Sequence, residues 1–496
     1  TAASGSGSLS YQWQSATAIG GPWTNLVGET NPTYDPPAGQ TVTTYFRLVV
    51  TSTLNGIVCS ATSAVLTITV NNVTPSVVAG NQTVCSGGNP AAFTVTTAAT
   101  GTGTLSYQWQ SSASALGPWT NIGGATSATY DPPTGLSTTT YYQVVISSAL
   151  NGVTCTTISN ALTVIVNSVT AQTIAAGQTI CSGGDAVAFT VTTASTGAGN
   201  LSYQWQSASL AAGPFSNIAG ATSSTYDHPA GQVASTYFQV VTSSVLNGVT
   251  CTSTSNVLAV LVNAVNSGTL GTSQTVCSGG NPNPFTASVV PSGSGTLTYQ
   301  WQSSTVGPNS GFAPIPGATT VSYDPPAGIS TTTYYQLVVT STLNGVPCTA
   351  TSATLSVTVN SLSAPVVGSN ETICSGGNPV AFTNPTPAIG AGNVTYQWQS
   401  STTNIGAGYS NITGANSATY DPPAGLNVTT YYQVITTSTL NGVACNVTSN
   451  PITVTVNTVS AGTVTQSQTI CSGGNPAAFT ATASPSGAGS LSYQWQ

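Results

Sequence analysis

The stretch Leu105-Ser106-Tyr107-Gln108-Trp109-Gln110 decides the fold, because apolar and polar residues alternate and give an extended strand one strongly apolar face. Its centre, Tyr-Gln-Trp-Gln, occurs six times in the chain, and its tryptophans are Trp13, Trp109, Trp205, Trp301, Trp398 and Trp495. They are separated by 96, 96, 96, 97 and 97 residues. A fixed period of this length indicates one small domain copied in tandem.

The composition excludes several classes of partner. The 496 residues include 1 Lys+Arg, 8 Asp+Glu and 1 His, so charged residues make up 2% of the chain against roughly a quarter in soluble proteins. Arg47 is the single Lys or Arg residue of the chain, so the chain cannot neutralise a series of phosphates. This excludes nucleic acid as a partner and disfavours binding to anionic membranes. No apolar run approaches the ~18 residues of a membrane span, so we expect no direct membrane insertion in this segment.

The copy from 72 to 167 reads as about seven short strands separated by turn signals. The strand-like segments are 82–85, 92–96, 105–110, 117–122, 128–130, 141–146 and 162–166. Asn151-Gly152 is the strongest hairpin signal among the turns. Because helical periodicity is absent, the pattern predicts an antiparallel β-sandwich. A tryptophan on the third strand and a tyrosine at the Asp-Pro-Pro corner are typical of an immunoglobulin-like sandwich, with the six tryptophans in its cores.

The fold class is therefore all-β, a tandem array of immunoglobulin-like antiparallel β-sandwich domains. A recurrent Val-Asn ends each copy, and the expected domains are partial repeat 1–71, full repeats 72–167, 168–263, 264–360 and 361–457, and partial repeat 458–496. Short junctions restrict bending, so we expect an extended rod to which each copy adds roughly 35–45 Å. Both ends cut through a repeat, which suggests a fragment of a longer chain.

The ten cysteines alternate at spacings of 26 and 70 or 71 residues, and they are Cys59, Cys85, Cys155, Cys181, Cys251, Cys277, Cys348, Cys374, Cys445 and Cys471. No Cys-x-x-Cys unit occurs and one histidine cannot serve five sites, which disfavours zinc. A regular, even set in a loop-rich chain of low charge indicates disulfides and an oxidising compartment.

Three disulfide pairings are open. The favoured one closes inside each copy and gives Cys85–Cys155, Cys181–Cys251, Cys277–Cys348 and Cys374–Cys445. The second links copies through pairs such as Cys59–Cys85 and uses all ten cysteines. The third joins the Ser-Gly-Gly turn of one copy to the Asn-Gly hairpin of the next.

The residue types that usually carry out catalysis are scarce, since the chain has 1 Lys+Arg, 8 Asp+Glu and 1 His. We therefore expect no catalytic residue, no cofactor and no enzymatic activity. His228 replaces the first proline of Asp-Pro-Pro in one copy and is interpreted as a chance substitution in a turn. The recurrent acids of that corner are expected to cap it, and they are weak metal candidates because calcium prefers several carboxylates together. They are Asp35, Asp131, Asp227, Asp324 and Asp421.

A second aromatic position recurs after Tyr-Gln-Trp-Gln. The copies carry there Trp23, Trp119, Phe215, Phe312 or Tyr409. Because any aromatic residue serves, packing is the favoured role, and an exposed ring that stacks on sugars is the alternative.

The ordered motifs resemble a known family. They are Cys85-Ser86-Gly87-Gly88-Asn89-Pro90, Tyr107-Gln108-Trp109-Gln110, Gly117-Pro118-Trp119-Thr120-Asn121-Ile122, Thr129-Tyr130-Asp131-Pro132-Pro133 and Asn151-Gly152-Val153-x-Cys155-Thr156. Over essentially the whole chain they look like the immunoglobulin-like, or PKD-like, repeats of giant Bacteroidota surface proteins, similar to gliding-motility adhesins exported by type IX secretion. The resemblance implies an extracellular, cell-surface location, with anchor and secretion domains elsewhere.

The predicted function is the stalk or filament segment of a large extracellular adhesin, which holds a distal binding region away from the cell. Its partners are the neighbouring repeats of the same chain. Two alternatives are a fibre formed by lateral homo-association through the uncharged surface, and spacer repeats of a secreted polysaccharide-degrading protein that bind surface glycans.

Overall fold

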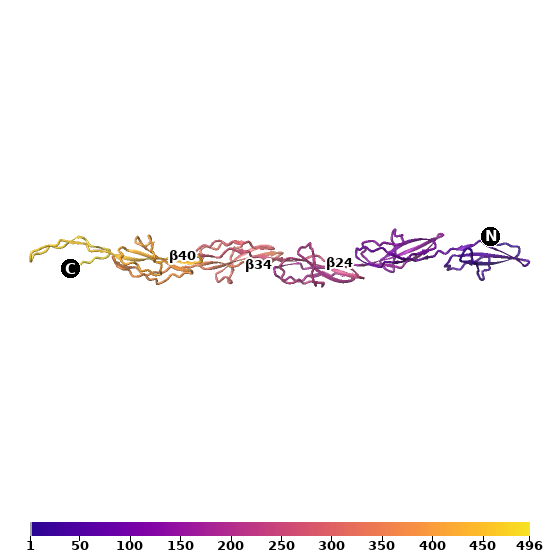
Figure 1. The fold of residues 1–496 in the computed structure, drawn as a ribbon, viewed down its shortest axis with the longest axis horizontal. Coiled ribbons are helices and arrows are strands. Elements are labelled where there is room, and N and C mark those ends of the chain that lie inside the picture. Colours follow the sequence, from indigo (N-terminus) through magenta and orange to yellow (C-terminus); the bar gives the residue numbers. More distant parts are fainter. Residues whose placement is uncertain (1) are drawn as a thin grey trace. The chain divides into compact units, whose positions relative to one another are not determined.

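The computed structural model describes residues 2–496, and its regular elements are strands joined by loops (Figure 1). We name each repeat after its tryptophan. The Trp13 repeat contains β1 (Ser8–Ala16), β2 (Thr24–Asn25), β3 (Thr44–Leu54), β4 (Ile57–Thr62) and β5 (Leu66–Ile68). The Trp109 repeat contains β6 (Val73–Thr74), β7 (Val77–Ala79), β8 (Gln82–Cys85), β9 (Thr94–Thr97), β10 (Thr100–Gly101), β11 (Thr104–Ser112), β12 (Thr120–Asn121), β13 (Thr140–Leu150), β14 (Val153–Ile158) and β15 (Leu162–Asn167).

The later repeats copy this order. The Trp205 repeat contains β16 (Val169–Thr170), β17 (Thr173–Ala175), β18 (Gln178–Cys181), β19 (Thr190–Thr193), β20 (Thr196–Gly197), β21 (Asn200–Ala208), β22 (Ser216–Asn217), β23 (Thr236–Leu246), β24 (Val249–Thr254) and β25 (Leu258–Asn263). The Trp301 repeat contains β26 (Val265–Asn266), β27 (Thr269–Leu270), β28 (Gln274–Cys277), β29 (Ala287–Val289), β30 (Ser292–Gly293), β31 (Thr296–Ser304), β32 (Ala313–Pro314), β33 (Thr333–Leu343), β34 (Val346–Thr351) and β35 (Leu355–Asn360). The Trp398 repeat contains β36 (Glu371–Cys374), β37 (Asn393–Ser401), β38 (Ser410–Asn411), β39 (Thr430–Leu440), β40 (Val443–Thr448) and β41 (Ile452–Asn457), followed by β42 (Val459–Ser460), β43 (Thr463–Thr465), β44 (Thr480–Ala483) and β45 (Ser486–Gly487).

The chain divides into two compact units. The first contains the chain up to Gln178, together with Ala186–Pro229 and Ser235–Val260. The second contains Thr179–Asp185, Ala230–Ala234 and Leu261–Gln496. The Trp13 and Trp109 repeats thus belong to the first unit, and the Trp301 and Trp398 repeats to the second.

Each full repeat is an asymmetric sandwich. In the first unit the large sheet of the Trp109 repeat has the order β12-β11-β13-β15-β8, and β14 also pairs with β13. The second layer is small and includes the pair β7–β9, while β6–β10 forms a separate ribbon. In the second unit the Trp301 and Trp398 repeats have large sheets of the same order. The chain is therefore an all-β tandem array of immunoglobulin-like sandwiches.

Three features differ from the strands expected from sequence. β8 runs parallel to β15, so the sheet is not wholly antiparallel. β14 was not expected as a separate strand, although Asn151 and Gly152 form the predicted hairpin with positive φ at both positions. Residues 127–129 form a bend in place of the expected strand, and the carbonyl of Tyr130 accepts from the backbone NH of Phe93, which directly precedes β9.

The core of each full repeat is a cluster of aromatic rings around a fully buried tryptophan. Trp109, Trp205, Trp301 and Trp398 have no exposed surface, and Trp13 is 8% exposed. The Trp109 indole stacks on Phe93 at 5.6 Å and on Tyr130 at 5.5 Å between ring centroids. Its Nε1 donates to the carbonyl of Ser127 at 3.0 Å, so the one polar group of the buried ring is satisfied.

Both glutamines of Tyr-Gln-Trp-Gln also have structural partners. Nε2 of Gln108 donates to the carbonyls of Trp109 and Ile122, which joins the residue that follows β12 to β11. Nε2 of Gln110 donates to Oδ1 of Asn121, and Gln143 donates to Oε1 of Gln110. The motif is therefore maintained by packing on one face and by an amide ladder on the other.

The sixth tryptophan departs from the prediction of a core position. Trp495 is 69% exposed, although its ring lies 6.5 Å from that of Phe479. In the other repeats a long strand such as β13 pairs with the tryptophan strand and covers this face. Among residues 2–496 no long strand pairs with the segment that contains Trp495, so this face of the ring is not covered by a sheet.

The tyrosines of this aromatic cluster predict an alkaline limit to stability. Burial raises the pKa of Tyr142, Tyr335 and Tyr432 from 10.0 to about 12, and a neighbouring tyrosine adds to the effect. These three tyrosines ionise near pH 10 in the unfolded chain but not in the folded chain, so the stability that they contribute below pH 10 should be lost as the pH rises towards 12. Denaturant unfolding at a series of pH values, with tyrosinate absorbance in parallel, measures this loss. Tyrosines of the folded chain that all titrate together with those of the urea-unfolded chain would contradict it.

Candidate functional site: the junction between repeats

Four side chains recur where one repeat meets the next, two from each side. In the first unit, β8 and β15 end side by side, with Cys85 opposite Asn167 in the register. On the following repeat Ser244 of β23 lies opposite Cys251 of β24. Asn167 pairs with Ser244 through hydrogen bonds and Cys85 pairs with Cys251 through a disulfide, so each cross-strand pair binds the other.

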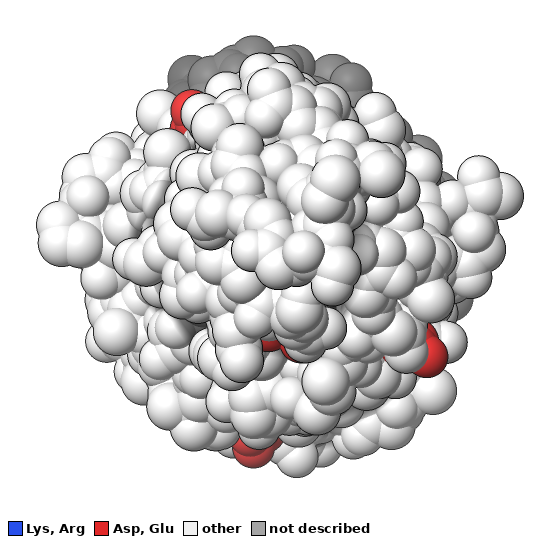
Figure 2. All heavy atoms as spheres, turned by 90° about the vertical axis from the view of Figure 1, so that its left-hand side faces the viewer, with Lys and Arg blue, Asp and Glu red and all other residues white. Residues whose placement is uncertain are grey.

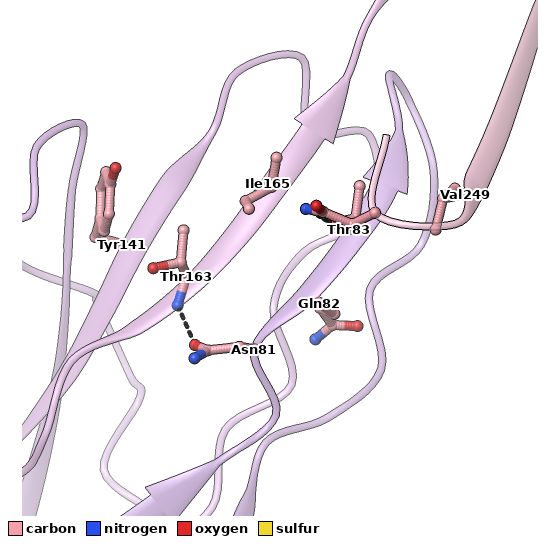
Figure 3. A pocket seen from close by; sticks show the side chains of 8 residues that line it. Asn81, Gln82, Thr83, Tyr141, Thr163, Ile165 and Val249 are labelled. Atoms are coloured by element: carbon pink, nitrogen blue, oxygen red, sulfur yellow. Dashed lines mark hydrogen bonds between the residues drawn. The ribbon is translucent and has the colours of Figure 1, made fainter. Parts of the chain in front are cut away.

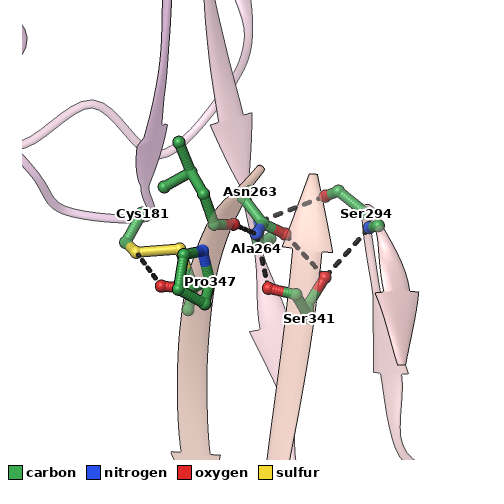
Figure 4. The surroundings of a disulfide bond; sticks show 9 residues. Cys181, Asn263, Ala264, Ser294, Ser341 and Pro347 are labelled. Carbon is green, nitrogen blue, oxygen red and sulfur yellow. Dashed lines mark hydrogen bonds between the residues drawn. A yellow bond between two sulfur atoms is a disulfide. The ribbon is translucent and has the colours of Figure 1, made fainter. Parts of the chain in front are cut away.

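The asparagine side chain makes three hydrogen bonds to the next repeat. Asn263 in the second unit donates from Nδ2 to the carbonyls of Ser341 at 2.7 Å and Val346 at 2.9 Å. Its Oδ1 accepts from the hydroxyl of Ser341 at 2.6 Å (Figure 4). Both side chains are 0% exposed. A buried amide with all these bonds made is favourable, whereas the same amide without them costs about 1–3 kcal/mol.

The same lock occurs at three further junctions. Asn71 bonds Ser148, Asn167 bonds Ser244, and Asn360 bonds Ser438 with the same donors and acceptors. At these four junctions the asparagine of the recurrent Val-Asn therefore fastens one repeat to the next. Sequence reasoning used this asparagine as a boundary marker and missed its bonding role.

Glycines make room for the lock. The backbone NH of Gly295 donates to the hydroxyl of Ser341 at 2.9 Å. A Cβ at Gly295 would collide with the carbonyl of Thr342, so only glycine lets this strand approach β33 so closely. Next to it, Ala264 and Ser294 exchange two further bonds across the start of the repeat.

The hairpin asparagine adds a bond at the junctions that carry a disulfide. Nδ2 of Asn247 donates to Oγ1 of Thr83 at 3.0 Å, and Asn344 bonds Thr179 in the same way. Beside the first of these bonds lies an open hollow of about 530 Å³ whose neutral lining includes Asn81 and Tyr141 (Figure 3). Hydroxyl, amide and aromatic groups of this kind suit neutral polar ligands.

The disulfides correct the favoured pairing. Among residues 2–496 the bonds are Cys85–Cys251, Cys181–Cys348 and Cys277–Cys445, with Cα–Cα distances of 5.5, 5.5 and 5.6 Å. The predicted pairs Cys85–Cys155, Cys181–Cys251, Cys277–Cys348 and Cys374–Cys445 are therefore wrong. The third alternative, from the Ser-Gly-Gly turn to the next Asn-Gly hairpin, is the one found.

Geometry explains the correction. Cys155 lies opposite Ser148, near the end of β13, whereas Cys85 lies beyond the start of β13, opposite Asn167. About eleven strand positions, or roughly 35 Å, separate the two cysteines of one sandwich. A disulfide needs Cα atoms closer than about 7 Å. Within the described residues the free thiols are those of Cys59, Cys155, Cys374 and Cys471.

The predicted metal candidates are not brought together. Asp35, Asp131, Asp227, Asp324 and Asp421 are all exposed, each at its own corner. Residues 2–496 contain no group of three or more His, Cys, Asp or Glu side chains that could hold a metal ion. After burial, the Asp131 charge is the second cause that raises the pKa of Tyr130.

His228 and the second aromatic position are packed rather than free. His228 is 3% exposed and meets Phe189 edge-on at 4.8 Å, so it fills a buried position and is not an exposed turn residue. Trp23 and its counterparts in later repeats are half-buried. Arg47 lies 4.3 Å above the Trp23 ring and donates to Gln14.

The family model described as "Domain of unknown function (DUF8696)" matches residues 1–72, 74–168, 170–264, 266–361 and 363–458. The chain belongs to this family. No curated protein matches the sequence. The described part of this DUF8696 chain contains no helix with the length and hydropathy to span a bilayer.

Several solved structures resemble the chain weakly. Three N-terminal domains of the Highly Immunogenic Outer Capsid protein of bacteriophage RB49 align at 13% identity and a TM-score of 0.28, over 57% of this chain and 98% of that one. Sidekick-1 immunoglobulin domains 1–5 align at 12% and 0.21, over 90% and 92%. The insect immune protein hemolin aligns at 11% and 0.20, over 77% and 99%. At these scores the likeness adds nothing to what the strand pairing shows.

The disulfide pattern predicts the products of non-reducing peptide mapping. With one basic residue the chain is poorly cut by trypsin, so pepsin is the suitable protease. Linked peptides should contain Cys85 with Cys251, Cys181 with Cys348, and Cys277 with Cys445, and alkylation should label Cys374 before reduction. Recovery of a peptide that links Cys85 to Cys155 would contradict the junction geometry.

Replacement of Asn263 tests the lock. Asn263→Ala leaves the carbonyls of Ser341 and Val346 buried without their donor, and we expect a loss of about 1–3 kcal/mol confined to that junction. Hydrogen–deuterium exchange on the full chain should therefore speed up around 338–350 and stay unchanged elsewhere. Asn309→Ala, at an exposed asparagine, is the matched control. Equal exchange in both variants would show that the amide is dispensable.

Proposed function

We propose that this DUF8696 chain is a stalk segment of a large extracellular surface protein, which holds a distal region away from the cell. The observation that supports it best is the junction, where a buried asparagine and, at three junctions, a disulfide fasten each repeat to the next. A passive spacer needs junctions that resist bending, and it needs no catalytic group.

The chemistry of the surface is consistent with this role. Disulfides form and persist in oxidising compartments, which favours a location outside the cell. Figure 2 shows a few scattered acidic groups on an otherwise uncharged face. Such a surface makes weak electrostatic contacts with other molecules. The motif resemblance to giant Bacteroidota adhesins points in the same direction.

Two alternatives use the same surface. Side-by-side association of chains would make a fibre, and the neutral hollow beside Tyr141 would suit contact with surface glycans. Both require exposed hydroxyl and amide groups to bind something, whereas the stalk requires only that the junctions stay closed. We favour the stalk because the recurring buried bonds lie at the junctions.

Removal of whole repeats tests the stalk. Deletion of 168–360 joins Asn167 directly to the repeat 361–457. It retains Cys85 as the turn cysteine and Cys445 as the hairpin cysteine of the new junction. Electron microscopy with antibody fragments bound to tags at the two ends should show the end-to-end distance shortened by roughly 70–90 Å, since two repeats of roughly 35–45 Å are lost. Antibodies to the repeats should also label intact cells. An unchanged end-to-end distance, or labelling of permeabilised cells alone, would refute the proposal.

A further inference from the structure

The three disulfides overlap along the sequence. Cys181 lies inside the loop closed by Cys85–Cys251, and Cys277 lies inside the loop closed by Cys181–Cys348. No bond therefore seals off one domain. Together they make a single covalent network from Cys85 to Cys445.

A short path crosses this network. It runs from Cys85 through its disulfide to Cys251, along the chain to Cys277, and through the third disulfide to Cys445. The main-chain part of this path has 26 peptide steps, whereas the chain itself takes 360 steps from Cys85 to Cys445. The 26-residue spacing that recurs between cysteines is the length of this connecting piece.

The connecting piece is mostly strand. From Cys251 the chain follows β24 and then β25. Both strands pair antiparallel with β23, at successive positions along it. It ends in β28 of the Trp301 repeat, which runs parallel to β35 of the same repeat. Strands already rise about 3.3 Å per residue, close to the limit of about 3.6 Å for a fully stretched chain. The paired parts of the path therefore hold little slack.

We infer that this path is a tension-bearing tie that carries axial load past the strands that hold the core tryptophans. The inference rests on the proposed stalk function, because a stalk is pulled from its two ends. When the ends are pulled, the stretch between Cys85 and Cys445 can lengthen only until the 26-residue piece is taut. The segments of 70 or 71 residues between turn and hairpin cysteines, which contain the core tryptophans, lie in loops off the tie.

The tie also limits how much the array lengthens when a repeat unfolds. If the Trp205 or Trp301 repeat loses its structure under load, its strands stay confined between two disulfides of the network. The array then keeps its length, and the repeat can refold in place. The junction asparagines hold the two ends of each disulfide together in the folded state, since Asn360 lies opposite Cys277 and bonds Ser438, which lies opposite Cys445.

Single-molecule stretching of the full chain tests the tie, with handles at the two termini and forces that unfold β-sandwiches. With the disulfides intact, the chain outside the network and the tie amount to 161 steps, so full extension should reach roughly 600 Å. After reduction the whole chain is free and should reach roughly 1,800 Å, a three-fold increase.

Removal of one bond gives the sharper measurement. Cys445→Ser leaves a shortest path that returns from Cys251 to Cys181, crosses to Cys348 and continues to position 445, which is 167 steps. The oxidised variant should therefore extend by roughly 500 Å more than the parent. Cys277→Ser removes the same bond from its other side and should give the same gain if Cys445→Ser folds poorly.

The matched control is Cys374→Ser, which removes a free thiol and should leave the extension unchanged. Two results would overturn the tie: an intact chain that reaches the reduced length, or a Cys374→Ser chain that gains roughly 250 Å, as bonds inside each repeat would require. The stretching experiment and the surface-labelling experiment fail independently. A chain absent from the cell surface would refute the stalk and leave the tie standing.

Discussion

The asparagine amide that is buried at three junctions, in Asn167, Asn263 and Asn360, is the interaction on which the array depends. At Asn263, for example, Nδ2 donates to two backbone carbonyls of the next repeat, and Oδ1 accepts from the hydroxyl of Ser341. The bond places β15 against the next hairpin, and this brings the turn cysteine beside the hairpin cysteine. A hydrogen-bonded amide thus sets the geometry in which a covalent bond forms, because a disulfide tolerates only a narrow range of Cα separations.

Inside each sandwich the constraint is different. Trp109 fills the centre and contacts the rings of Phe93 and Tyr130, and Tyr142 packs edge-on against Phe93. Such contacts are tolerant, which is why the periphery varies from copy to copy, as His228 at the place of a proline shows. The junction tolerates less, because an amide, a hydroxyl and a glycine backbone must meet within hydrogen-bond distance.

Sequence reasoning predicted what local periodicity controls. The alternation around Trp109 and the Asn151-Gly152 turn specify strands and a hairpin by their own chemistry. Pairing between distant segments is not local, so neither the parallel contact of β8 with β15 nor the path of β14 was foreseen. The disulfides were misassigned for the same reason, because spacing along the chain does not say that Cys85 and Cys155 lie at opposite ends of one sandwich.

That separation has a consequence for biogenesis. As the chain emerges amino-terminus first, Cys85 and Cys155 are both available long before Cys251 has appeared. A repeat that folds at once holds these two thiols about five times too far apart to react with each other. Early folding of the repeat therefore prevents a disulfide between Cys85 and Cys155, and Cys85 remains available for Cys251. The turn cysteine of each newly made repeat stays unpaired until the next repeat has folded, so the disulfides form one after another from the amino-terminal end.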